Sequence, residues 1–93
     1  MTTHAVVMLR VTNPDSLAQY RKKATDALAR HGGEVVQASP DLTVLEGAPV
    51  MPDALAIVRF PDRAAAEAWI ADPDLQPIHD LRRGAGASDI LLL

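Results

Sequence analysis

The side chains of this sequence that could do chemistry begin with its histidines, which titrate near neutral pH. His31 is the strongest candidate of the three, because it ends the first expected helix on the same apolar stripe as Tyr20. An imidazole in that position could act as a general acid or base. The simpler interpretation, which we favour, is that His31 interacts with the last carbonyls of the helix and with its dipole. His79 is expected to be solvated, and His4 to lie at a fraying end.

Trp69 and Arg82 are the distinctive residues of the C-terminal half. Trp69, the only tryptophan, is expected to pack its helix onto a sheet and, secondarily, to form the wall of a pocket. Arg82 either reaches over that wall or neutralises the carbonyls at the end of its own helix.

Composition and spacing argue against several classes of function. The sequence has no cysteine, and its histidines at positions 4, 31 and 79 lack metal-ligand spacing, so neither a metal nor another cofactor is expected. A net charge of −3 and only three aromatic residues argue against nucleic acid as a partner. No segment approaches the roughly 20 apolar residues that cross a bilayer, and no basic flank marks a signal peptide. A cytoplasmic protein without a membrane partner is expected.

The helices and strands that must position these residues can be predicted from the pattern of apolar residues and from the residues that begin and end each element. Asn13 and Pro14 begin the first helix, whose apolar stripe runs from Leu17 to His31, with Arg21 and other charged residues mostly on the opposite side. Gly32 ends it. The expected strands are Ala5–Val11, Glu34–Ala38 with Leu42–Glu46 as a broken strand or hairpin arms, Ala54–Phe60 and Ser88–Leu93; the other helices are Arg63–Ala71 and a short one with Leu75, Ile78 and Leu81 inside.

This order, β-α-β-β-α-β in one domain of residues 1–93, predicts an α+β, ferredoxin-like fold. Its four-stranded antiparallel sheet carries both helices on one face. The other face should then show polar residues at alternate positions. Instead Val6, Met8, Leu55 and Ile57 put apolar groups there. Exposing them would be costly in a small domain, so we expect a homodimer that packs sheet on sheet as an α/β barrel.

Arg10 and Arg59 each interrupt one of these apolar strands. If Arg10 shares a face with Val6 and Met8, and Arg59 with Leu55 and Ile57, both guanidinium groups project into the dimer interior and must be paired there. Glu46, or the carboxylate of a ligand, could be the partner. The two interpretations, an ion pair that fixes the dimer and the floor of an anion-binding pocket, stay open.

Several short motifs together resemble a known family. They are Tyr20, His31-Gly32-Gly33, Leu45-Glu46-Gly47, Phe60-Pro61, Ala64-Ala65, Ala68-Trp69, Asp74 with Gln76, and Arg82. In order and spacing the chain resembles the bacterial domain-of-unknown-function family numbered thirteen-thirty, in the dimeric α/β-barrel superfamily. It departs from the family pattern at Ile70, Asp72-Pro73 and Leu75, where hydroxyl or aromatic groups are usual. The resemblance implies the fold and a dimer but no established reaction.

These observations predict a pocket between sheet and helices. Its candidate residues are Tyr20, His31, Glu46, Arg59, Trp69 and Arg82. The expected function is to bind or transform a small, anionic organic metabolite; as an enzyme, the protein would use cofactor-independent acid/base or oxygenase-type chemistry, as relatives that share the barrel do. The alternative is a non-catalytic dimeric accessory or ligand-sensing module.

Overall fold

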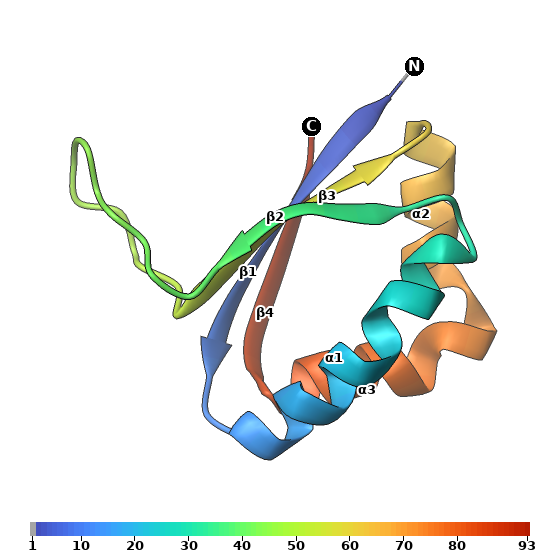
Figure 1. Ribbon diagram of the computed structural model, residues 1–93, viewed down its shortest axis with the longest axis horizontal. Helices are drawn as coiled ribbons and strands as arrows, with labels where there is room; N and C mark the ends of the chain where they lie inside the picture. Colours follow the sequence, from blue (N-terminus) through green and yellow to red (C-terminus); the bar gives the residue numbers. More distant parts are fainter. Residues whose placement is uncertain (1) are drawn as a thin grey trace.

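A computed structural model describes residues 2–93, and its elements follow the expected order (Figure 1). They are β1 (Thr3–Val11), α1 (Pro14–Ala29), β2 (Glu34–Ser39), β3 (Ala54–Phe60), α2 (Arg63–Ala71), the 3₁₀ turn η1 (Pro73–Leu75), α3 (Gln76–Gly84) and β4 (Gly86–Leu92). No helix in residues 2–93 combines the length and the apolar character needed to cross a membrane. The β-α-β-β-α-β order predicted from the sequence is confirmed.

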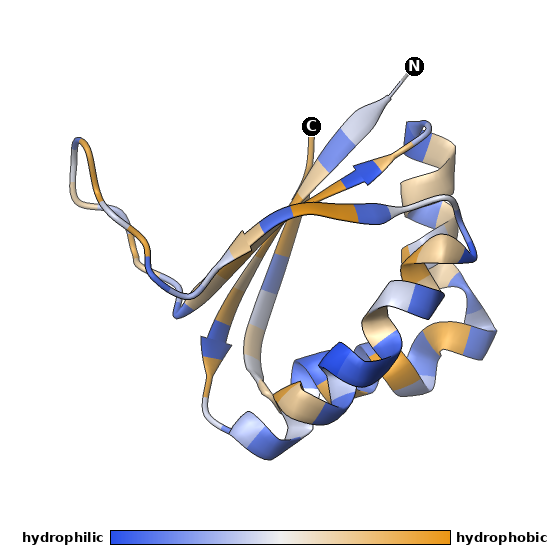
Figure 2. Ribbon diagram, viewed as in Figure 1, coloured by the Kyte–Doolittle hydropathy of each residue, from blue (hydrophilic) through white to orange (hydrophobic). Residues whose placement is uncertain are grey.

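The four strands form one antiparallel sheet in the order β2-β3-β1-β4. All the helices lie on one face of it, and the other face is uncovered (Figure 1). This is the ferredoxin-like arrangement. Strand alternation divides the side chains: Ala5, Val7, Leu9, Val58 and Phe60 are buried under the helices. Figure 2 shows apolar residues concentrated along the strands of the sheet.

The first helix begins and ends where its residues require. The Asn13 side chain accepts a hydrogen bond from the Ser16 amide at 3.2 Å, and Pro14 follows as the first helical residue. At the other end Gly32 adopts a positive φ of 73°. The amide of Gly33 donates to the Leu28 carbonyl, and a Cβ on Gly33 would lie 2.7 Å from the Phe60 ring. The predicted glycine stop therefore also lets α1 approach the sheet closely.

The segment Leu42–Glu46 is not a strand, and here the sequence prediction was wrong. It belongs to a long loop, residues 40–53, which projects from the ends of β2 and β3 and which we call the arm (Figure 1). β2 pairs directly with β3, with one irregularity between Val35 and Gln37, and residues 42–46 pair with neither strand. Asp53 fixes the base: its carboxylate accepts from the Val11 amide at 2.7 Å, and its amide donates to the Leu9 carbonyl.

Candidate functional site

A cavity of about 360 Å³ lies between α1 and the sheet. Most of its wall is apolar, with exposed side chains such as Arg21 and Thr25 at the rim. The sheet contributes Val7, Leu9, Val35, Ala38, Ser39, Ala54, Leu55, Ala56 and Val58; α1 contributes Leu17, Tyr20, Arg21, Ala24, Thr25 and Leu28; Pro40 and Trp69 complete the lining. The cavity exceeds the lower size of about 300 Å³ typical of small-molecule sites.

Small side chains at facing positions explain why this space exists. Ala24 on α1 faces a sheet that presents Ala38, Ala54 and Ala56. A methyl group on each side of a helix–sheet interface leaves room that larger residues would fill. The cavity therefore results from alanines at inward-facing positions of α1 and the sheet.

Tyr20 and Trp69 form the aromatic part of the wall. Trp69 is 3% exposed; its ring lies 5.6 Å from that of Phe60 and meets the His79 ring edge-on at 4.7 Å. Its indole Nε1 is buried and, among residues 2–93, has no hydrogen-bond acceptor. Since buried donors are nearly always paired, this N–H is a feature to explain.

Arg82 lies behind this aromatic wall and is only 1% exposed. Its guanidinium carbon is 5.5 Å from the centre of the Tyr20 ring and 5.3 Å from that of Trp69. Nε donates to Ser88 Oγ at 3.0 Å; Nη1 donates to His79 Nδ1 at 2.8 Å and, at 3.4 Å, to the Tyr20 hydroxyl. Within residues 2–93 no carboxylate forms an ion pair with Arg82. A buried positive charge is thus held only by neutral groups.

These contacts fix the protonation of His79. A guanidinium group can only donate, so Nδ1 is the acceptor and Nε2 carries the proton, which it donates to the Trp69 carbonyl at 2.9 Å. Burial lowers the pKa of His79, and the positive charge of Arg82 adds to that effect. The imidazole is therefore neutral and has both nitrogens engaged. The predicted solvated position of His79 was wrong, since its exposure is 0%.

The cause of that error is the rotation of α3. Leu75, Ile78 and Leu81 were predicted to face inward. Ile78 does pack against the core while half-buried, but the buried side chains of this segment are Leu75, His79 and Arg82. Their spacing of four and then three residues is itself helical, so the periodicity was visible. It was overlooked because it places two polar residues in the core, where they persist only with partners.

His31 lies away from the cavity and from Tyr20's hydroxyl. Its Nε2 is 2.8 Å from the carboxylate of Asp72, which also lies 3.3 Å from Arg30. The hydrogen bond to His31, followed by one from the Asp74 amide, lowers the pKa of Asp72. Asp72, one of the departures from the family pattern, therefore ties the end of α1 to the end of α2.

Glu46 and Arg59 also lie outside the cavity. Arg59 faces Glu34 across the β2–β3 ladder and forms an ion pair with it, both side chains being half exposed. Glu46 is at the tip of the arm, next to Gly47, because its segment is not a strand. Of the six candidate residues, Tyr20 and Trp69 line the cavity and Arg82 contacts both; the expected pairing of Glu46 with the strand arginines is not formed.

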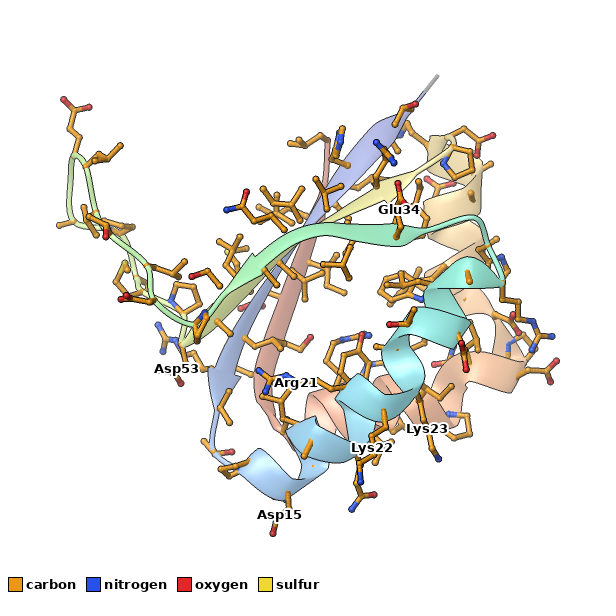
Figure 3. All side chains as sticks on the ribbon, in the orientation of Figure 1. Asp15, Arg21, Lys22, Lys23, Glu34 and Asp53 are labelled. Atoms are coloured by element: carbon orange, nitrogen blue, oxygen red, sulfur yellow. The ribbon has the colours of Figure 1, made fainter. Side chains whose placement is uncertain are left out.

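Arg21 is the rim residue that the sequence analysis placed on the outer side of α1. It lines the cavity together with Leu17, Ala24 and Leu28. These residues are spaced by four, three and four, so the helical period could have found it. In Figure 3 the Arg21 side chain runs from α1 toward the sheet, whereas Lys22 and Lys23 point away from it.

The chain belongs to the family of domains of unknown function DUF1330, whose model matches residues 2–93. The sequence-based family assignment is confirmed. No protein of curated function matches the chain. Within residues 2–93 no three His, Cys, Asp or Glu side chains group as a metal site.

Solved structures share the fold. A protein of unknown function from Rhodopseudomonas palustris matches with a TM-score of 0.72 and 24% identity, over 99% of this chain and 78% of that one. SnoaB, a cofactor-independent oxygenase from Streptomyces nogalater, matches with a TM-score of 0.71 and 19% identity, over 99% and 90%. A dimeric ferredoxin-like protein of unknown function from Jannaschia sp. CCS1 matches with a TM-score of 0.68 and 16% identity, over 100% and 98%. At such identities the likeness concerns the fold.

Proposed function

We propose that this DUF1330 member is a small cytoplasmic homodimer, one α/β-barrel domain per chain, which binds a small, anionic organic molecule in the cavity between α1 and the sheet. The observation that carries the proposal is the combination of an open apolar cavity with a buried Arg82 that has no carboxylate partner. Desolvating a guanidinium costs several kcal/mol, and hydrogen bonds to neutral groups offset that only in part. The remaining positive potential favours a ligand with an electron-rich oxygen beside Tyr20.

Tyr20 connects that charge with the cavity. Its hydroxyl accepts a hydrogen bond from Arg82, and its own hydrogen has no acceptor among residues 2–93. The hydroxyl is therefore free to donate to a carbonyl or enolate oxygen of a ligand, and Arg82 strengthens it as a donor.

Two versions of this function follow. As an enzyme, the protein would stabilise an enolate of its substrate, which could itself supply the electrons to oxygen; the shared fold of SnoaB is compatible with such cofactor-independent chemistry. The alternative is a non-catalytic accessory or ligand-sensing module. One observation favours the alternative: within the described part of the chain, no carboxylate or imidazole lines the cavity to act as a base.

The uncovered sheet face supports the homodimer. Leu91 and Leu93 on it are 60% and 70% exposed, beside half-buried Met8 and Ile57. The arm adds Leu45 and Val50, which are 95% and 77% exposed. Apolar groups in such number mark an association surface, and the Jannaschia protein of the same fold is dimeric. A second copy would cover this face.

A thermal-shift screen of metabolites tests the proposed binding, because a ligand bound only by the folded protein raises its melting temperature. Ala56→Phe, which puts a large ring into the cavity, should abolish the shifts produced by the hits. Ala18→Phe, on the exposed side of α1, is the matched control and should retain them. Hits that survive Ala56→Phe would show that the cavity is not the site.

A further inference from the structure

Arg21 is a cation at the mouth of an apolar cavity. Its side chain runs toward the sheet, unlike Lys22 and Lys23, which follow it on α1 and point into solvent (Figure 3). Among residues 2–93 it takes part in no ion pair. Arg30, at the end of α1, has carboxylate partners in Asp72 and Asp74, whereas Lys22 and Lys23 form no ion pair among residues 2–93 but point away from the cavity. Arg21 is thus a cation at the cavity that no carboxylate of the described residues neutralises.

The rest of the lining defines what a ligand would meet. Besides Arg21, the polar side chains are Tyr20, Thr25 and Ser39. Ser39 Oγ is already engaged, since it donates to the Asp41 carbonyl and accepts from the Asp41 amide, both at 3.0 Å. Apart from the Tyr20 hydroxyl, the interior is therefore suited to a hydrocarbon body, and a full negative charge is accommodated only at the rim.

The cavity volume limits the size of that body. A cavity of about 150 Å³ holds benzene, with six carbon atoms. Scaled in proportion, the 360 Å³ found here would hold about 14 non-hydrogen atoms. A bicyclic aromatic acid or a medium-length fatty acid has this size.

We infer that the ligand is an amphipathic monocarboxylate, whose apolar body fills the cavity against Tyr20 and Trp69 and whose carboxylate pairs with Arg21 at the mouth. The inference rests on the proposed function, since it names the ligand class of the same cavity. It also assigns the ion-pairing role to Arg21 rather than to Arg82, which lies behind the aromatic wall and does not line the cavity. Guanidinium and carboxylate are matched in geometry for two parallel hydrogen bonds.

The probes are 2-naphthoate and its neutral isostere 2-naphthamide, each with 13 non-hydrogen atoms, close to the estimated capacity of about 14. Calorimetric titration at low salt should show naphthoate binding about tenfold more tightly than naphthamide, and added salt should reduce the difference. Arg21→Gln should remove the preference by weakening naphthoate alone. Lys22→Gln removes the same charge from a side chain that points away and should keep the preference.

The outcomes separate the inference from the proposed function. Equal affinities for the two probes in the wild type, or equal effects of Arg21→Gln and Lys22→Gln, would overturn the carboxylate at Arg21 while leaving cavity binding intact. Failure of both probes to bind at millimolar concentration would also overturn the ligand class. Binding of both probes that Ala56→Phe does not weaken would instead refute the cavity as the binding site, and with it the proposed function.

Discussion

Arg82→Met replaces the buried guanidinium by an apolar side chain of similar length. We expect the free energy of unfolding of this variant to lie within about 2 kcal/mol of the wild-type value, because the opposing effects nearly cancel. The gain is the removed desolvation penalty of a cation that has no carboxylate partner in residues 2–93. A change this small would show that Arg82 is not required for stability, as its proposed role beside the cavity implies.

The losses can be counted from the contacts. His79 Nδ1 is left buried without a donor, which costs about 1–3 kcal/mol. The hydroxyls of Ser88 and Tyr20 each lose a longer hydrogen bond from Arg82, of 3.0 and 3.4 Å, and can rotate toward other partners. The two cation–π contacts, about 1 kcal/mol each, are replaced in part by contacts of the methionine sulfur with the same rings. Replacing a whole buried ion pair or triad by apolar groups has been neutral or stabilising by about 1–4 kcal/mol in other proteins, which is of the same size as these losses.

Urea unfolding at constant protomer concentration measures the difference, with Arg82→Ala as the comparison. The alanine variant leaves a void as well and should be less stable than Arg82→Met by about 2–3 kcal/mol. A loss of more than about 4 kcal/mol in Arg82→Met would contradict the reasoning, since that is the cost of breaking a buried ionic arrangement on which the fold depends. Arg82 would then be a structural residue, and the argument for an electron-rich ligand beside Tyr20 would lose its main support.

Three further changes test other parts of the structure. His79 has a lowered pKa, so below pH about 6.5 the unfolded chain binds a proton that the folded chain does not. The free energy of unfolding should therefore fall as the pH drops from about 6.5 toward the lower pKa of the folded state. Urea titrations at pH about 5 and 7.5 measure this dependence, and His79→Gln should flatten it. Gly86→Ala should destabilise the fold by about 3 kcal/mol or more, because the new Cβ would overlap the Arg10 carbonyl oxygen at a φ of +150°. Gly47 has a φ of +88° but lies in open space, so Gly47→Ala should cost only about 1–2 kcal/mol. Equal losses of stability in thermal melts of the two variants would refute the steric argument. Ile57→Lys puts a charge on the uncovered sheet face and should give a monomer by light scattering, while Ala18→Lys should not; an Ile57→Lys dimer would mean that this face is not the interface.

The elements that could be read from the sequence are those with local signals. β3, Ala54–Phe60, and α2, Arg63–Ala71, agree with the prediction at both ends, because Pro52 precedes the strand and the Pro61-Asp62 corner separates the two. Asp62 caps α2 through the Ala65 amide at 2.7 Å. Such signals act within a few residues, so they are visible without knowledge of the rest of the chain.

What was missed depends on partners far away in the sequence. Residues 42–46 have the apolar character of a strand, but a strand also needs a neighbour, and β3 is already paired with β1 and β2. Likewise His79 is buried because Arg82 and the Trp69 carbonyl satisfy its two nitrogens. Neither condition can be read from the local pattern of hydrophobic residues.

The site differs from the predicted one for a related reason. The predicted site was made up mainly of polar and charged residues, whereas the cavity exists because Ala24, Ala38, Ala54 and Ala56 have small side chains. A polar residue can then contact a ligand only if it lies at the wall or the rim of this cavity. Arg59 is a more conspicuous arginine than Arg21, since it interrupts a strand, but it lies on the other face of the sheet and is paired. A site of this kind is therefore indicated in a sequence by a helix and a sheet that both present alanines inward. A second indication is a cation, such as Arg21, that follows the helical spacing of the inward residues and so lies at the rim of the cavity.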